Sequence, residues 1–269
     1  MALPKYKYND VIKYWRNLNI ESENDLRNAL SSYSILFAYN SGGIENKEIT
    51  YYDTREIFEN GKIINFSGSL RTLYEIANQK DCFEYLITKI INKEELSEEL
   101  IKKIHKLLTK GTYDERGYVV NKERPGEYKK HDYVTGALEV GSDVEDVENE
   151  MKNLINELSI STKDDEDIIL TAAYLHNMFE KIHPFADGNG RTGRTIMNYY
   201  LLIHNLPPTI IYNDDKKYYY EALEKFDTDN DLDSTINFFK YEMEKTWQRS
   251  IDRANGIVSD NKPLSYYLK

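Results

Sequence analysis

The sequence predicts a mainly α-helical fold that carries a single β-hairpin. Apolar residues recur at helical spacing through most of the chain, as Ile168, Leu175 and Phe179 do between residues 167 and 181. Only residues 118–138 combine β-branched and aromatic residues with a turn signal. Hydrophobic residues make up 40% of the chain and charged residues 30%, which is typical of a globular protein with a sizeable core.

Apolar stripes and capping residues mark the expected helices. Asn9 or Asp10 can cap the first helix, and Leu26 and Leu30 begin the stripe of the second. In chain order, helices are expected at residues 9–18, 24–39, 54–59, 69–92 (one helix or a pair), 97–109, 144–160, 167–181, 195–205, 216–226 and 236–251. Core positions expected in two of them are Leu70, Leu73, Ile76, Ala77, Leu100, Ile104 and Leu107.

The expected hairpin consists of two short runs on either side of a turn. Residues 118–120 form the first strand, Pro125 and Gly126 lie near the turn, and residues 133–138 form the second strand. A lone hairpin is only marginally stable in water, so we expect it to pack on the helices.

The composition excludes several classes of protein. The formal net charge of −11 argues against a protein that follows a nucleic-acid backbone. Cys82 is the only cysteine, which leaves no intrachain disulfide. The start lacks the apolar run of a signal peptide and no stretch is long enough to span a membrane, so we expect a soluble, cytoplasmic protein. An acidic protein whose hairpin presents an edge could also form a homodimer.

The most informative stretch is residues 183–194, with the sequence HPFADGNGRTGR. Pro184 disfavours the α conformation of His183, so the preceding helix should end there. A mostly apolar helix resumes after the glycines, with Arg191 and Arg194 on one face of its first turn. Helix N-termini carry unpaired N–H donors and a partial positive charge, which two cations oppose. The arrangement therefore predicts a bound anion.

The anion that suits this loop best is a polyphosphate. Gly188 and Gly190 let backbone N–H groups turn toward it, and two guanidinium groups can each bind its oxygens in a bidentate way. Asp187 would repel phosphate unless a divalent cation such as Mg²⁺ lay between them, although it could also simply pair with Arg191 or Arg194.

His183 also has two interpretations. It could be an ordinary histidine at a helix end, favoured by the helix dipole. Beside a metal–phosphate site, its imidazole could instead take a proton from an attacking hydroxyl group.

These twelve residues match every defined position of His-x-Phe-x-Asp/Glu-Gly-Asn-Gly-Arg-x-x-Arg, and in this the chain resembles Fic-domain proteins. The resemblance implies a Fic-type helical bundle that transfers AMP from ATP to a protein hydroxyl. It makes His183 the base and Asp187 the Mg²⁺ ligand, and it implies a target protein that can be the enzyme itself. The nucleotide-binding residues that it implies in this region are Gly188, Asn189 (for the α-phosphate), Gly190, Arg191, Gly193, Arg194 and Asn198.

An earlier segment, residues 41–46, resembles the inhibitory helix of autoinhibited Fic proteins. Ser41 and Glu45 would be neighbours on a helical turn, and the resemblance implies that Glu45 pairs with Arg194. Spacing alone favours a simpler interpretation, in which a helix ends at Gly42 and Gly43 and a polar loop follows.

The resemblance extends to two more regions. The hairpin corresponds to the flap that covers the nucleotide and pairs with an extended target segment, with Val134, Thr135, Gly136 and Ala137 nearest the nucleotide. Residues 126–129 resemble the start of that flap, although a lysine replaces the commoner arginine at position 129. Two tyrosines are similar to those of the adenine site, but in a chain with 23 tyrosines they could also be packing residues: Tyr219 and Tyr220.

We therefore expect three parts in the chain. Residues 1–40 form a helical extension, residues 41–251 form the catalytic domain with the inhibitory motif and a flap at residues 117–140, and residues 252–269 form a tail. The leading hypothesis is a Mg²⁺-dependent protein adenylyltransferase restrained by Glu45. The alternatives are an enzyme of the same fold that transfers another phosphate-bearing group or removes AMP, and a nucleotide-binding module without catalysis.

Overall fold

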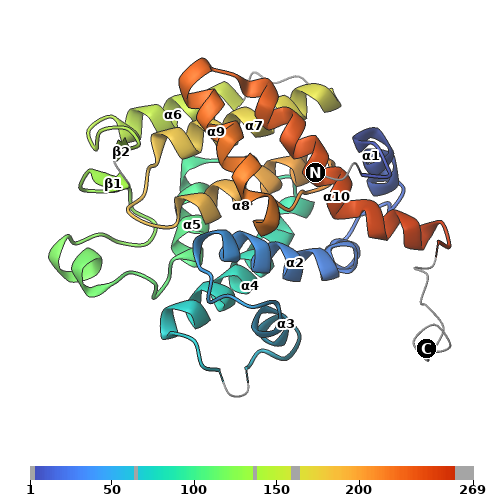
Figure 1. Ribbon diagram of the computed structural model, residues 1–269, viewed down its shortest axis with the longest axis horizontal. Helices are drawn as coiled ribbons and strands as arrows, with labels where there is room; N and C mark the ends of the chain where they lie inside the picture. The colour runs from blue at the N-terminus through green and yellow to red at the C-terminus, as the bar shows by residue number, and fades with distance from the viewer. Residues whose placement is uncertain (1–3, 64–65, 136–137, 159–163, 258–269) are drawn as a thin grey trace, which may run out of the picture.

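A computed structural model describes residues 4–63, 66–135, 138–158 and 164–257, and it is mainly helical (Figure 1). The α-helices of the described residues are α1 (Tyr8–Arg16), α2 (Glu23–Glu45), α3 (Tyr51–Asn60), α4 (Leu70–Ile91), α5 (Glu98–Leu108), α6 (Val147–Leu158), α7 (Asp165–Ile182), α8 (Asn189–Ile203), α9 (Lys216–Asp229) and α10 (Leu232–Ala254). The shorter elements are a π-helical turn η1 (Arg116–Val120), a 3₁₀ turn η2 (Asn213–Asp215) and two strands, β1 (Tyr133–Thr135) and β2 (Leu138–Val140).

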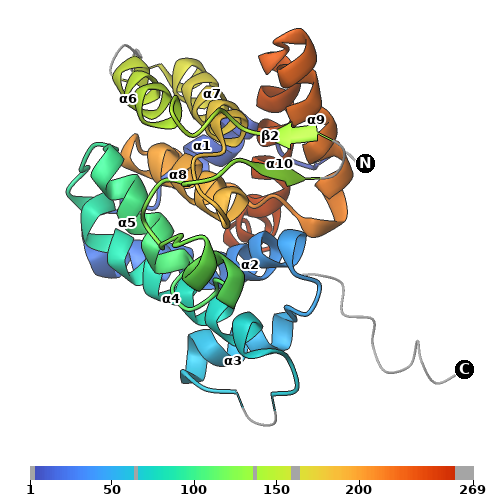
Figure 2. The same ribbon diagram turned by 90° about the vertical axis from the view of Figure 1, so that its left-hand side faces the viewer.

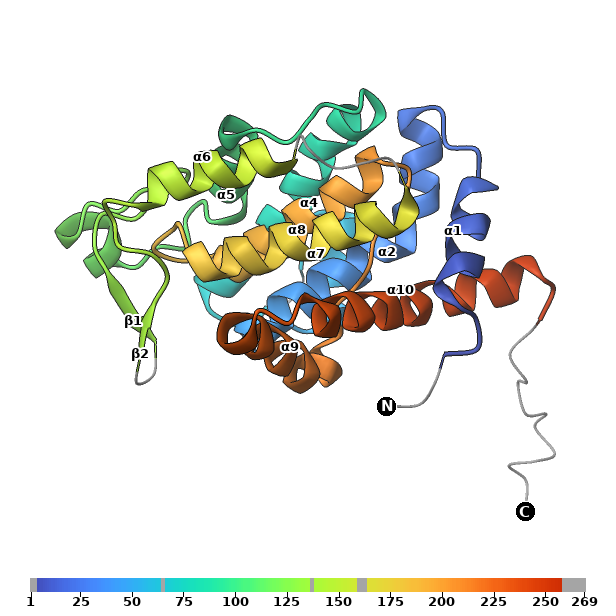
Figure 3. The same cartoon turned by 90° about the horizontal axis from the view of Figure 1, so that it is seen from above.

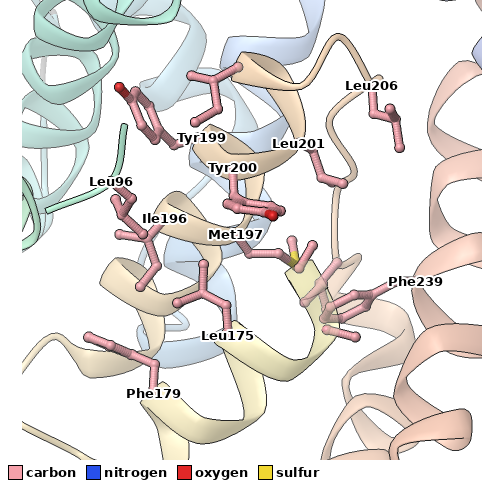
Figure 4. Close-up of a cluster of buried hydrophobic side chains, with 14 of the residues drawn as sticks. Leu96, Leu175, Phe179, Ile196, Met197, Tyr199, Tyr200, Leu201, Leu206 and Phe239 are labelled. Carbon is pink, nitrogen blue, oxygen red and sulfur yellow. The ribbon is translucent and has the colours of Figure 1, made fainter. Parts of the chain in front are cut away.

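Helix α8 lies at the centre of the fold. It packs against α7, α5, α4 and α2, and every residue from Arg191 to Leu201 is buried. A helix that is buried on all sides needs apolar residues all round, and α8 supplies them through Ile196, Met197 and its tyrosines (Figure 4). The polar residues at the start of this helix must therefore find partners inside the protein.

The two ends of the molecule differ. Helix α1 packs on α10 at one end, and β1 and β2 lie at the opposite end, where α7 connects to α8 (Figures 1 and 3). Helix α3 lies at the edge of the molecule, against α2 and α4 (Figure 2). No helix of the described residues is long and apolar enough to cross a membrane.

The helices expected from the sequence are present, and the structure answers two questions that the sequence left open. Residues 69–92 form the single helix α4, capped by Ser69. Helix α2 continues through both of its glycines to Glu45, and a Cβ atom on Gly42 would lie 2.6 Å from the Ile49 side chain. Close packing against Ile49 thus explains a glycine inside a helix.

The expectation of a strand at residues 118–120 is wrong. These residues lie in η1, where the Asp114 side chain accepts from the Gly117 N–H and Arg124 lies 3.9 Å from the Tyr118 ring centre. They are exposed, so their β-branched side chains have no sheet against which to pack. Instead, β1 pairs with β2 in an antiparallel register that sets Tyr133 opposite Val140.

Leu70 is also not a core residue. It is the first residue of α4, with 64% of its surface exposed, whereas Ile76, Leu100 and Ile104 are buried as expected. The periodicity of an apolar stripe does not reveal that its first member precedes the packed part of the helix.

Candidate active site

His183 ends α7 in an unusual backbone conformation. Its φ of 49° and ψ of 60° are left-handed, and its N–H still donates to the Phe179 carbonyl at 3.0 Å. The expectation that Pro184 ends the helix here is confirmed. Burial and the nearby Lys129 ammonium lower the pKa of His183 to about 4, so the ring is neutral at physiological pH. A neutral imidazole can accept a proton.

The segment that contains β1 and β2 is attached on both sides of His183. The Lys129 N–H donates to the Pro184 carbonyl at 2.9 Å, and the Ser142 N–H donates to the Ile182 carbonyl at 3.0 Å. Between them, Gly141 has a φ of 92°, and a Cβ atom there would lie 2.5 Å from the Cβ atom of His183. The root of the hairpin is thus fixed beside the candidate base.

The loop after His183 is closed by its own asparagine. The Asn189 side chain accepts from the Phe185 N–H at 2.9 Å and donates to the Phe185 carbonyl at 2.7 Å. Its amide group is therefore occupied by the loop, which leaves its backbone N–H for a ligand. Asn189 is the first residue of α8, and the first N–H groups of a helix have no acceptor within it. The N-terminus of α8 thus presents N–H donors at the position where the sequence predicts an anion.

Asp187 lies at the edge of a polar cavity of about 640 Å³ and is one-third exposed. One of its carboxylate oxygens accepts from the Gly188 N–H at 2.7 Å, and the other accepts from the Arg71 guanidinium at 2.8 Å. The described residues contain no cluster of three metal-ligating side chains. One accessible carboxylate nevertheless fits Mg²⁺, which commonly takes one or two carboxylates and completes its shell with phosphate and water.

Arg191 lies between the loop and α4. Its Nη1 lies 3.3 Å from the Glu75 carboxylate and its Nη2 lies 3.6 Å from Asp187. Glu75 also accepts from Arg71 and Asn46. Arg191 and Glu75 are both almost fully buried. Arg191 therefore has a structural partner that could not be predicted from the sequence.

Arg194 contacts the end of α2. Its Nη2 donates to Glu45 Oε1 at 2.9 Å and to the Ser41 carbonyl at 2.8 Å, and its Nε donates to Ser41 Oγ at 3.0 Å. The structure thus contains the Glu45–Arg194 pair that the resemblance implies. A Cβ atom on Gly190 would overlap with Oε1 of Glu45, so this carboxylate lies directly over the first turn of α8. Glu45 therefore supplies an anion at the predicted position.

Behind Arg194 lies a second buried polar group. Burial raises the pKa of Glu180 to about 7, against the opposing influence of Arg194. A Cβ atom on Gly193 would lie 2.7 Å from the Glu180 carboxylate, which explains the glycine at this helix contact. The Tyr219 hydroxyl bonds to His176 at 2.9 Å.

The remaining predicted residues differ in their burial and in their contacts. Tyr219 is 1% exposed and packed in the core, whereas Tyr220 is 47% exposed, with ring centres 5.2 Å apart. The Asn198 amide bonds in both directions to the main chain of Thr209 and so joins α8 to the following segment. Two of the predicted flap residues, Gly136 and Ala137, lie outside the described residues. Of two others, Val134 and Thr135, only the main chain is described.

Sequence reasoning missed five residues that contact the loop or its partners: Arg71, Glu75, His105, Lys129 (noted only for its place in the flap) and Gly141. The spacing of Arg71 and Glu75 indicates an i,i+4 ion pair, but nothing in the sequence connects that pair to a loop more than a hundred residues away. His105 carries no signal beyond its place in an amphipathic helix.

The fold and the site define a mainly helical protein built around a glycine-rich loop that leads from a histidine into a buried helix N-terminus. Residues 95–201 match the model of the Fic/DOC family, and the chain thus contains a Fic domain. It is 29% identical over 227 residues to protein adenylyltransferase Fic of Drosophila persimilis and 28% identical over 228 residues to that of Drosophila melanogaster. These matches cover 84% of this chain but only 42% and 44% of the relatives, so the chain spans less than half of their length.

Solved structures share the fold. A Fic-domain-containing signaling protein from Bacteroides thetaiotaomicron has a TM-score of 0.77 at 23% identity, with 94% of this chain and 99% of that chain covered. Fic-1 from C. elegans has a TM-score of 0.73 at 23% identity, with 93% and 73% covered.

Proposed function

We propose that this protein is a protein adenylyltransferase that transfers AMP from ATP to a Tyr, Ser or Thr hydroxyl, including its own, and that Glu45 inhibits it. The observation that carries this proposal is the carboxylate of Glu45 on Arg194, over the first turn of α8 and beside a loop that begins with a neutral histidine. The activity in the names of the Drosophila relatives supports the same reaction.

The chemistry assigned to the site is an in-line displacement at the α-phosphorus of ATP. The target oxygen forms a bond to phosphorus as the bond to pyrophosphate breaks, and His183 takes the proton of the hydroxyl group. Backbone N–H groups of the α8 N-terminus stabilise the phosphate oxygens, since they point at the ligand and carry the positive end of the helix dipole. A bound polyphosphate would also favour protonated His183, which raises the low pKa of the free site toward the working range.

Magnesium would be held by Asp187 and would supply charge that offsets the negative phosphates. The Asp187 side chain suits this role because it is accessible from the cavity and fixed by the Gly188 N–H. Arg71 now occupies its second oxygen, so metal binding and the Arg71 contact compete for the same carboxylate.

Inhibition follows from competition for Arg194. This guanidinium is fully buried, and Glu45 and Ser41 of α2 hold it. A γ-phosphate on Arg194 and the Glu45 carboxylate are both anions, and they exclude one another by charge. With Glu45 in place, the phosphates of ATP cannot align for in-line attack.

The hairpin supplies a place for the target. Its root lies beside His183 through the Lys129 and Ser142 contacts, so an extended target segment added to the edge of β1 or β2 would pass close to the base. Tyr220, exposed beside the buried Tyr219, is available for the adenine ring.

Labelled ATP tests this proposal. The wild-type protein and the Glu45→Gly variant are incubated with Mg²⁺ and ATP labelled on the α- or the γ-phosphate, with and without chelator. Mg²⁺-dependent incorporation of the α label alone, greater in the variant, is the expected result. Incorporation of the γ label would replace this proposal with phosphoryl transfer. ATP binding without incorporation of either label would leave only a nucleotide-binding module.

A further inference from the structure

His105, on α5, joins two segments that the sequence places far apart. The side chain is fully buried, and its Nε2 lies 2.8 Å from the main-chain oxygen of Asp187. Its Nδ1 lies 2.8 Å from the backbone N–H of Gly126. The ring also stacks on Phe185, with ring centres 3.7 Å apart and planes 4° from parallel. Two hydrogen bonds and one stacking contact therefore fix the position and the rotation of this ring.

The two partners determine the tautomer. The Gly126 N–H can only donate, so Nδ1 must be the unprotonated nitrogen of His105. The Asp187 carbonyl oxygen can only accept, so Nε2 must carry the hydrogen. The neutral ring uses both of its nitrogen atoms.

The bond to Asp187 bears directly on its carboxylate. Nε2 of His105 binds the carbonyl of the peptide group between Asp187 and Gly188, and Oδ1 of Asp187 accepts from the N–H of that same peptide group at 2.7 Å. A rotation of this peptide plane would therefore break the bond that orients the carboxylate. It would also turn Gly188, which has a left-handed φ of 79° and caps α8.

We propose that His105 is a positioning residue: it fixes the Asp187–Gly188 peptide so that the Asp187 carboxylate faces the cavity in the orientation that binds Mg²⁺. Its second bond, to Gly126, ties the same ring to the segment that leads into β1 through Lys129. The loop and the root of the hairpin are thus held by one side chain. The metal-binding part of this inference rests on the proposed function.

Two substitutions separate the two hydrogen bonds. In His105→Gln the side-chain amide reaches the position of Nε2 and can donate to Asp187, but it leaves Gly126 without its acceptor. In His105→Asn the side-chain oxygen lies near the position of Nδ1 and can accept from Gly126, but it does not reach Asp187. Both variants lose the stack on Phe185, so each is the control for the other in stability.

Amide hydrogen exchange on the full chain measures which segment loosens. We expect faster exchange in the peptide that spans residues 185–192 for His105→Asn, and faster exchange around Gly126 for His105→Gln. Identical exchange patterns in the two variants, at matched thermal stability, would overturn the assignment, because a merely structural histidine would loosen both segments alike.

Nucleotide binding measures the consequence. We expect Mg²⁺ to strengthen binding of α,β-methylene-ATP in the wild-type protein, and this gain to fall about tenfold in His105→Asn but to stay within about threefold in His105→Gln. An unchanged gain in His105→Asn would overturn the positioning role. If Mg²⁺ has no effect on the wild-type protein, the proposed metal site fails, and the exchange pattern alone then decides whether His105 holds the loop.

Discussion

Arg191 and Arg194 lie three residues apart on one helix, and both are buried, but their partners differ. Arg191 faces Glu75, whose side chain is only 3% exposed. Arg194 faces Glu45, whose side chain is 38% exposed. One arginine is sealed inside the protein with its carboxylate, and the other meets a carboxylate that is open to solvent.

This difference separates a structural ion pair from an exchangeable one. Removal of a partner from a fully buried pair leaves an uncompensated charge that water cannot reach. A carboxylate at the surface can leave and be replaced by another anion at the same N–H groups and guanidinium. We therefore expect different roles for the two arginines, although the resemblance implies that both bind the nucleotide.

The largest effect is expected from the base. His183→Ala in the Glu45→Gly background should lower the rate of AMP incorporation by about 10²–10⁴-fold, because only the proton transfer is lost. The affinity for ATP should stay nearly unchanged, since the α8 N-terminus and Arg194 remain. Intact-mass measurement of AMP incorporation tests the predicted loss of rate, and calorimetry of ATP binding tests the predicted affinity. Full activity in the double variant would refute the assignment of the base and remove the reason to regard Glu45 as a competitor at a catalytic site.

The two ion pairs should contribute differently to the unfolding free energy. Glu75→Ala should cost about 3–5 kcal/mol of unfolding free energy, because it leaves the buried Arg191 without its nearest partner. Glu45→Ala should cost only about 1 kcal/mol, because the removed carboxylate was partly hydrated already. Urea denaturation of both variants gives the comparison directly. Equal losses would mean that the two arginines are held in the same way.

Activity should change in the opposite sense for Glu45. Glu45→Gly should raise AMP incorporation by about tenfold or more, which corresponds to about 1.4 kcal/mol of released competition for Arg194. Glu21→Gly, an exposed glutamate that precedes α2, is the matched control and should leave the rate unchanged. Both variants are compared with the wild type at equal ATP and Mg²⁺ by intact-mass gain of AMP. A variant as slow as the wild type would make residues 41–46 a helix end without regulatory function.

Local features of this fold were predictable because their causes are local. Pro184 determines where α7 ends, and the apolar periodicity marks each helix that packs on the core. The anion position at the start of α8 followed from two cations placed against a helix dipole. Even the contact between Glu45 and Arg194 followed, but only through the resemblance of residues 41–46 to a known motif.

Features that depend on distant contacts were not predictable. Glu75 sits among Arg71, Arg191 and Asn46, which come from three separate segments of the chain. The strand expected at residues 118–120 failed for a related reason: β-propensity needs a partner surface, and these residues project from the fold instead. Contacts of this kind are set by the packing of α4 and α5 on α8, which no periodicity reports.

The smallest effect concerns a second carboxylate near Arg194. Burial raises the pKa of Glu180 to about 7 from its usual 4.5, with Glu45 adding to the increase, so the folded protein holds a proton that the unfolded chain releases. The stabilisation that this proton provides is complete below the unfolded pKa and is lost as the pH rises through about 7. Glu180→Gln keeps the shape of the side chain but cannot titrate. The wild type should therefore lose about 1 kcal/mol of unfolding free energy relative to this variant between about pH 6 and about pH 8.

The quantity to measure is the difference in unfolding free energy between the wild type and Glu180→Gln, by urea denaturation at each pH. Other buried groups titrate in the same range, but they contribute equally to both proteins and cancel in this difference. His105, His176 and His183 have lowered pKa values through burial and gain stability with rising pH, opposite in sign to Glu180. In a Glu45→Gln background the loss should end at a lower pH and be smaller, since one carboxylate that raises the folded pKa of Glu180 is gone. Ionised Glu180 would then be the carboxylate that remains beside Arg194. A difference that stays flat across this range would show that Glu180 is already ionised beside Arg194, and that Arg194, like Arg191, has a permanent buried partner.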